Sequence, residues 1–239
     1  MTKVMNRSVR TTVVPLLMAS TAMLGALSAT PASAGRRAVP EAAPTLQADY
    51  RFGNTLASSV PGAPRLRDIN ANGNNLFVPD GPRTVLRFPE GNGLRLGNAT
   101  SVIPRGRYTI AIRMRFDTVT GYRRVVNFKP DSSDNSDTGL YVSDGDLVFY
   151  SRVFPDVDSI GAGELVTVVL TRSTRNRLRG YVDGVEQFDI NDPNGRARIG
   201  ANNLLRFFRD DANREESAGS VARIRLWDGP LTPAQVAAL

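Results

Sequence analysis

Cysteine and histidine are both absent from the 239 residues. Without cysteine the chain has no disulfides, so its stability must come from a buried core, which a chain of this length can supply. Without histidine it lacks the usual general base of nucleophilic triads and the commonest zinc ligand. Any chemistry must therefore depend on carboxylates, arginine, tyrosine, serine or threonine.

Lysine is scarce as well, since Lys129 is the only one beyond residue 34. Of the 30 basic residues, three lie within residues 1–34, and the 27 that remain against 23 acidic residues give a net charge of +4. The arginines are spread along alternating segments such as 108–117, whereas a nucleic-acid binder gathers its charge in one patch. We therefore expect solvent-facing arginines on a β-sheet and no nucleic-acid partner.

Long apolar runs are confined to the N-terminus. Three basic residues precede an apolar run over 12–29, and 32–34 form an A-x-A cleavage pattern, so 1–34 is predicted to be a signal peptide. The alternative is a membrane anchor, but the run is short for a bilayer span and is interrupted by Pro15. No later segment is long enough to span a membrane, and we expect a secreted, extracellular protein that begins at Gly35.

Short strands dominate the rest of the chain. Residues 35–46 are rich in alanine and proline and are predicted to be a flexible N-terminus. In 108–117 apolar residues alternate with charged ones, which predicts a strand with one buried and one wet face. Asp-Gly pairs at 144–145 and 183–184 predict tight hairpin turns, in which both residues take a positive φ.

Helical periodicity is absent until 233–239, where we expect one short C-terminal helix. Roughly a dozen strands at short spacing with almost no helix favour an all-β fold. The prediction is a two-sheet antiparallel sandwich over residues 47–239.

The stretch 204–231 is predicted to hold two strands joined by an acidic loop. In the first strand Leu205 and Phe207 alternate with Arg206 and Phe208, so the two pairs are expected on opposite faces. Apolar and arginine residues alternate in the second strand, which a turn ends.

Several segments resemble the laminin-G-like or concanavalin A-like jelly-roll modules of secreted bacterial proteins. Gly219–Val236 fits their closing pattern except that Ala222 stands where an acid is usual, and Gly139–Val142, Val168–Arg172 and Gly180–Gly184 match too. The resemblance covers roughly residues 49 to 239. It implies a jelly roll whose first strand lies beside the last, with Tyr50 near Leu226. It does not decide function, because this sandwich carries lectins, adhesion modules and glucanases.

The densest group of carboxylates lies between the last two strands. Asp210, Asp211 and Glu216 are predicted to bind calcium with backbone carbonyls, provided that the chain breaks at 212–213, since neighbouring strand residues point to opposite faces. Glu215 is an alternative ligand to Glu216. The competing interpretation is a solvated acidic loop.

A second acidic loop, 131–139, resembles part of an EF-hand. Counted from Asp134, the glycine falls correctly at Gly139, but the twelfth position is Gly145, which has no side chain to bind the ion. The EF-hand is therefore rejected. Two interpretations of this loop remain. It is a solvated loop, or it contributes to a calcium site or to the rim of a ligand site.

Four residues are predicted to bind a ligand. Sugars stack on tryptophan and tyrosine rings and hydrogen-bond to polar groups beside them. Trp227 alternates with the core residues of its strand, as does Arg225, while Tyr150 and Tyr181 are further ring candidates. The alternative for Trp227 is packing at the sheet edge.

The function predicted from these features is a secreted, non-catalytic recognition module for an extracellular glycan or a cell-surface protein. One alternative is a carboxylate-dependent glycoside hydrolase or lyase. The nearest approach to its paired acids is Glu186 and Asp189, which strand geometry is expected to put on opposite faces. The other alternative is a structural or adhesion module of the cell envelope.

Overall fold

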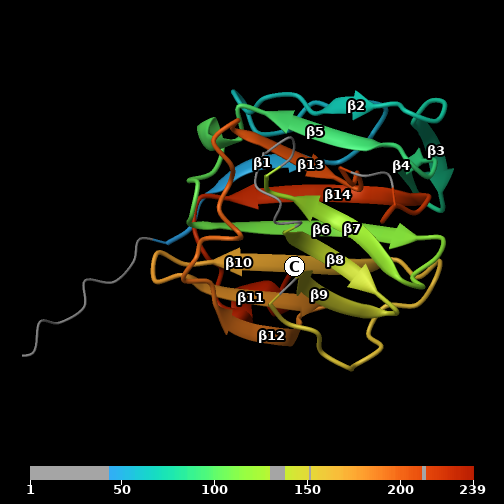
Figure 1. The fold of residues 1–239 in the computed structure, drawn as a ribbon. Helices are drawn as coiled ribbons and strands as arrows, with labels where there is room; N and C mark the ends of the chain where they lie inside the picture. Colours follow the sequence, from blue (N-terminus) through green and yellow to red (C-terminus); the bar gives the residue numbers. More distant parts are fainter. Residues whose placement is uncertain (1–42, 130–137, 151, 212–213) are drawn as a thin grey trace, which may run out of the picture. The chain divides into compact units, whose positions relative to one another are not determined.

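The computed structural model describes residues 43–129, 138–150, 152–211 and 214–239. Within these ranges two antiparallel β-sheets pack face to face, with one apolar core between them (Figure 1). The α-helix in the same ranges, α1 (Pro233–Ala237), follows the last strand. The two-sheet sandwich with a short C-terminal helix is therefore confirmed.

The eight-stranded sheet lies behind the other sheet in Figure 1. Its main path, in spatial order, is β12 (Val185–Asn191), β11 (Arg177–Val182), β10 (Val166–Arg172), β6 (Tyr108–Phe116), β14 (Gly219–Trp227), β4 (Arg83–Phe88) and β3 (Leu76–Asp80). The eighth strand, β1 (Leu46–Tyr50), pairs with the second half of β14, while β4 pairs with the first half. The first strand thus lies beside the last, as expected, with Tyr50 opposite Ile224.

The six-stranded sheet faces the viewer in Figure 1. Its spatial order is β2 (Arg67–Ile69), β5 (Gly93–Gly97), β13 (Leu204–Phe207), β7 (Tyr122–Asn127), β8 (Gly139–Ser143) and β9 (Asp146–Tyr150). Both strands predicted in 204–231 are present, but β13 and β14 belong to different sheets. The acidic loop between them therefore crosses from one layer of the sandwich to the other.

Alternation along the strands builds most of the core, and Phe208 is a place where it fails. Ile110 and Ile112 of β6 are buried between the sheets as predicted, and so is Phe207 of β13. Phe208 was expected on the opposite face from Phe207, yet it is also buried and stacks on Phe88 with ring centroids 4.5 Å apart. Its φ of 64° breaks the strand alternation and turns the ring inward.

The predicted hairpin turns are confirmed. Asp144 and Gly145 have φ values of 51° and 95°, and Asp183 and Gly184 have φ values of 45° and 82°. At the start of the sandwich, Thr45 donates its N–H to Asp228 at 2.7 Å, so the described chain is already held in place before β1.

Helix α1 covers part of the outer face of the eight-stranded sheet. Thr232 caps the helix, because its hydroxyl accepts from the Gln235 N–H at 3.3 Å and its own N–H donates to the Gln235 side chain at 2.9 Å. A second, smaller apolar cluster lies there, made of Ala111, Val169, Tyr181, Trp227, Leu231 and Val236. In the described part of the chain, no helix is long and apolar enough to cross a membrane.

Candidate functional site

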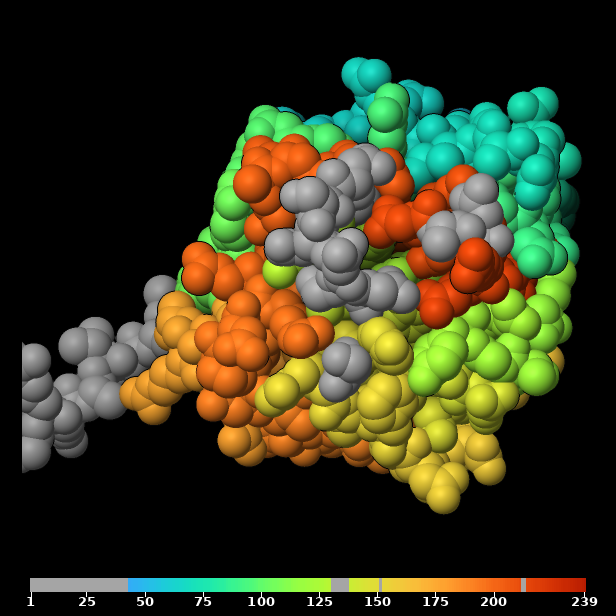
Figure 2. Space-filling view, viewed as in Figure 1, coloured from blue at the N-terminus to red at the C-terminus, as the bar shows by residue number. Residues whose placement is uncertain are grey.

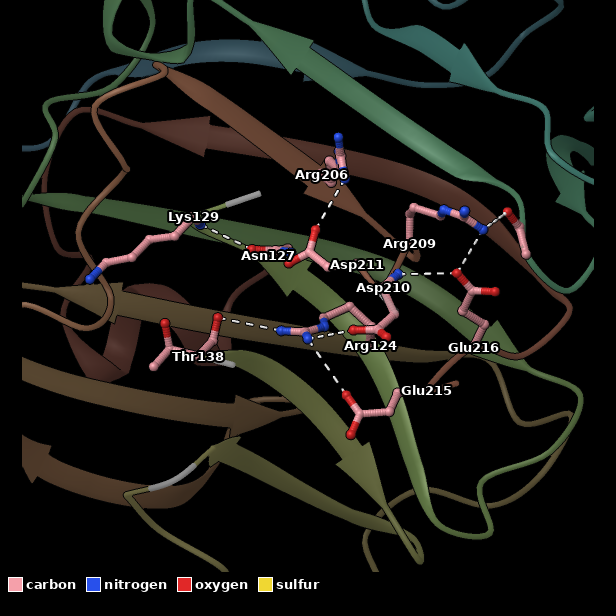
Figure 3. Close-up of polar contacts among 11 residues, drawn as sticks. Arg124, Asn127, Lys129, Thr138, Arg206, Arg209, Asp210, Asp211, Glu215 and Glu216 are labelled. Atoms are coloured by element: carbon pink, nitrogen blue, oxygen red, sulfur yellow. Dashed lines mark hydrogen bonds and ion pairs between the residues drawn. The ribbon is translucent and has the colours of Figure 1, made fainter. Parts of the chain in front are cut away.

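The acidic loop between β13 and β14 lies against the outer face of the six-stranded sheet, where its carboxylates meet arginines (Figure 3). Asp210 Oδ1 is 2.6 Å from Arg124 Nη2. Both side chains are buried, at 0% exposed for Arg124 and 3% for Asp210. Removing two charges from water is costly, and this pair offsets the cost through close contact.

Arg124 is the centre of this arrangement. Its guanidinium lies 4.1 Å from the ring centroid of Tyr141. Figure 3 shows its contact with Glu215, whose Oε2 is 3.5 Å from Arg124 Nη2. Arg124 also donates to the Thr138 carbonyl at 3.4 Å. Gly139 makes room for it, since a Cβ there would lie 2.5 Å from Arg124 Nη1. Cation–π contact and ion pairing together fix the guanidinium in one position.

Two further arginines form ion pairs with the other predicted metal ligands. Glu216 Oε1 accepts from Arg209 Nη1 at 2.8 Å, and burial raises the pKa of the Glu216 carboxyl while Arg209 opposes that shift. Asp211 pairs with Arg206 at 3.1 Å and accepts from the Asn127 amide at 2.8 Å (Figure 3).

The three predicted calcium ligands thus have three different cationic partners. In the described residues, no group of three or more carboxylates is arranged to hold a metal ion. Residues 212–213, where the chain was predicted to break, lie outside the described ranges, as does most of the second acidic loop at 130–137. Calcium binding stays a prediction, and the ion must displace arginine to bind.

Thermal melts with calcium and with chelator test that prediction. An ion at a hundredfold its dissociation constant stabilises a fold by about 2.7 kcal/mol, so calcium should raise the melting temperature. Asp211→Ala should abolish that rise, because this carboxylate is 44% exposed and can turn toward an ion without opening a buried pair. If the parent chain and Asp211→Ala melt at the same temperature with calcium and with chelator, the loop does not bind calcium.

Trp227 and Tyr181 do not offer the free ring faces that were predicted to bind a ligand. Trp227 is 8% exposed and Tyr181 is 1% exposed, because both lie in the cluster beneath α1. Alternation correctly placed Trp227 off the main core, but a helix covers it there. Arg225 lies beside Trp227, with its guanidinium 5.3 Å from the indole ring.

Of the three rings predicted to bind a ligand, Tyr150 borders a surface. Its ring meets Tyr122, Tyr141 and Phe154 at centroid distances of 5.5, 6.1 and 6.0 Å, with interplanar angles of 71° to 84°. We call these four rings the aromatic face. Phe154 is 53% exposed. Figure 2 views this side of the molecule, with the segment around β8 and β9 in yellow-green and yellow.

The aromatic face and the Arg124 arrangement are continuous, because Tyr141 belongs to both. Burial raises the pKa of the Tyr122 hydroxyl in the same face, and nearby Tyr150 and Glu215 raise it further. The hydroxyl therefore stays neutral and able to donate a hydrogen bond near neutral pH. Rings beside fixed polar groups are what recognition of a sugar requires.

Sequence reasoning missed Arg124. Its partner Asp210 is 86 residues away, and nothing in the pattern says which arginine becomes buried. The available signal was indirect. A loop with four carboxylates in seven residues needs cations, and Gly139 opens a strand at the place where a side chain would block one.

A family model described as the concanavalin A-like lectin/glucanases superfamily matches residues 88–237. The chain belongs to this superfamily. The resemblance stated from the sequence is thereby confirmed. No curated protein matches the sequence.

Solved structures with the same fold come from several kinds of protein. Domain 4 of AbnA, a GH43 extracellular arabinanase from Geobacillus stearothermophilus in complex with arabinotriose, is 17% identical, with a TM-score of 0.61 over 82% of this chain and 98% of that one. The botulinum neurotoxin serotype D binding domain is 10% identical, with a TM-score of 0.58 over 81% and 51%. Trypanosoma rangeli sialidase is 17% identical, with a TM-score of 0.53 over 69% and 28%.

These likenesses show the jelly-roll fold of the superfamily. Carbohydrate-binding domains, toxin binding domains and glycosidases all contain it, so the fold leaves binding and catalysis both open. The choice depends on the side chains of this chain.

Proposed function

We propose that this protein is a secreted, non-catalytic module that recognises an extracellular carbohydrate with the aromatic face of its six-stranded sheet. The observation that carries the proposal is the group of partly exposed rings at Tyr150 and Phe154 beside the partly exposed Tyr122, whose hydroxyl is a polar group within the same face. A sugar presents apolar C–H faces to such rings and hydroxyls to the polar groups beside them. Export by cleavage of residues 1–34 is part of the proposal.

The arabinanase domain supports a carbohydrate ligand, because it is described in complex with arabinotriose. A related toxin binding domain is described in complex with rat synaptotagmin II, which keeps a cell-surface protein as the second class of ligand. At 12% to 17% identity these neighbours support the class of ligand only through the fold they share with this chain.

A glycan array combined with a reducing-sugar release assay tests the proposal. We expect binding of at least one glycan, and no release of reducing ends from that glycan over hours. A cell-surface protein that binds while every glycan fails would contradict the carbohydrate ligand. Turnover that requires a carboxylate would contradict the non-catalytic role.

One specific observation favours the glycosidase alternative. Glu186 and Asp189 were expected on opposite faces of β12, but both contact Arg179, at 3.8 and 3.0 Å. The register shifts there, since Gly180 pairs with Phe188 and Tyr181 with Glu186, and the extra residue brings the two acids to one side.

The same geometry weighs against Asp189 as the general acid of this pair. Burial favours a higher pKa for Asp189, but hydrogen bonds and charge from Arg177 and Arg179 outweigh it and lower the pKa. Asp189 is therefore ionised and already neutralised by arginine, whereas a general acid needs a raised pKa. The variants Glu186→Gln and Asp189→Asn belong in the release assay, and loss of turnover in both would favour the enzyme.

A further inference from the structure

A hollow of about 180 Å³ opens on the outer face of the eight-stranded sheet, beside the C-terminal helix. Four of its lining residues are arginines: Arg83 on β4, Arg113 on β6, and Arg223 and Arg225 on β14. We call it the arginine hollow. No aspartate or glutamate lines it, and the one anionic group among the lining residues is the terminal carboxylate of Leu239.

Strand register concentrates this charge. Arg223 lies directly opposite Arg113 across β14 and β6, and like charges in that position destabilise a sheet. Arg225 lies opposite Ala111, whose small side chain leaves the space between the guanidiniums open. An anion placed between two arginines that face each other reduces their repulsion and stabilises the folded chain.

The arginines are only partly neutralised by the protein. Arg223 pairs with Asp49 at 2.7 and 2.9 Å, but Asp49 is shared with Arg51 at 2.7 Å. Burial would raise the pKa of Asp49, but hydrogen bonds from Arg223 and Arg51 outweigh it and lower the pKa to about 2. Its single negative charge is thus fully engaged.

Of the remaining arginines, Arg225 has one acceptor, and Arg83 and Arg113 have none among the described residues. Arg225 donates to an oxygen of the terminal carboxylate of Leu239 at 3.2 Å, and burial followed by the charge of Arg223 lowers the pKa of its guanidinium. Arg83 and Arg113 are exposed, and neither guanidinium has a hydrogen bond or ion pair with another residue that the structure describes. The hollow therefore holds an excess of positive charge with free N–H donors.

We propose that the arginine hollow is a second binding site, which takes an oxyanion group such as a carboxylate, sulfate or phosphate carried by an extracellular polymer. Planar guanidiniums match such groups with paired hydrogen bonds. At roughly 30 Å³ for each water in the liquid, 180 Å³ is room for about six waters, enough for one oxyanion and the part of the ligand that carries it. This site is on the opposite sheet from the aromatic face and stands independently of it.

Isothermal titration of the whole chain at low salt tests the site. The probes are inorganic sulfate, inorganic phosphate, a galacturonate oligosaccharide and a neutral oligosaccharide of the same length. We expect at least one anionic probe to bind. Any binding of the neutral oligosaccharide should not depend on these arginines. The strongest anionic probe then identifies whether a carboxylate, a sulfate or a phosphate is the natural group.

Matched variants separate a site from general charge attraction. Arg113→Gln should weaken binding of that probe about tenfold or more, since it removes a charged hydrogen-bond donor from the hollow. Arg95→Gln removes the same charge from an exposed position on the other sheet and should change it less than twofold. Equal losses in the two variants, or no binding of any anionic probe, would overturn the proposal.

Folding of the test variant is checked separately. Arg113 faces Arg223, so its neutral replacement relieves repulsion and the melting temperature should stay level or rise. A fall in melting temperature with unchanged anion affinity would assign Arg113 a structural role and would also contradict the site.

Discussion

Replacing Arg124 with alanine is expected to lower the free energy of unfolding by about 3–5 kcal/mol. The change leaves the Asp210 carboxylate buried without its cation and takes the guanidinium off the Tyr141 ring. Marginal stability in proteins is about 5–15 kcal/mol, so this variant should lose a large part of it. Urea unfolding followed by circular dichroism measures the change.

A matched control comes from the same network. Arg206 pairs with Asp211, but that carboxylate is 44% exposed, and exposed pairs contribute only about 0–1 kcal/mol. Arg206→Ala should therefore cost much less than Arg124→Ala. Equal costs would mean that burial of the Arg124–Asp210 pair does not decide the stability of this region.

Replacing Trp227 with alanine is expected to cost about 3–5 kcal/mol, the usual range for truncating a buried tryptophan. The ring fills the cluster between the eight-stranded sheet and α1, where Leu231 and Val236 pack on it. Trp227→Phe keeps an aromatic ring there and should cost less. Chemical denaturation of the two variants measures the difference.

The same variant decides the role of Trp227. Because the indole is buried beneath α1, Trp227→Phe should bind glycan like the parent chain. A variant that keeps its stability but loses glycan binding would restore the ligand role first predicted for this residue.

Local pattern was enough to predict the strands and turns. Alternation in β6 and the Asp-Gly pairs at 144–145 and 183–184 are short-range features, and each residue type there has a direct backbone or burial consequence. Pattern could not tell that β13 and β14 lie in different sheets, since both look like neighbouring strands of one hairpin.

The contacts of the side chains were harder to predict from the sequence than the fold. The carboxylate cluster was found, but its partners Arg124, Arg206 and Arg209 depend on strand pairing across the sandwich. Trp227 was rightly placed off the core, yet only the later apolar residues and the Thr232 cap hinted that a helix returns to cover it.

The arginine hollow shows the same limit. Spread along the sequence, its four arginines gave the pattern of a solvated sheet face. The register of β6 against β14 brings two of them opposite each other, and β4 supplies a third. Sequence spacing therefore excluded a linear basic patch but not a charge cluster made by pairing.

The most direct test of the carbohydrate proposal is the affinity of an array-identified oligosaccharide for Phe154→Ala and for Leu76→Ala. Both residues are exposed apolar side chains, at 53% and 58%, but only Phe154 belongs to the aromatic face. We predict that calorimetry will show an affinity about tenfold weaker for Phe154→Ala and unchanged for Leu76→Ala. Unchanged affinity in Phe154→Ala would contradict recognition by the aromatic face.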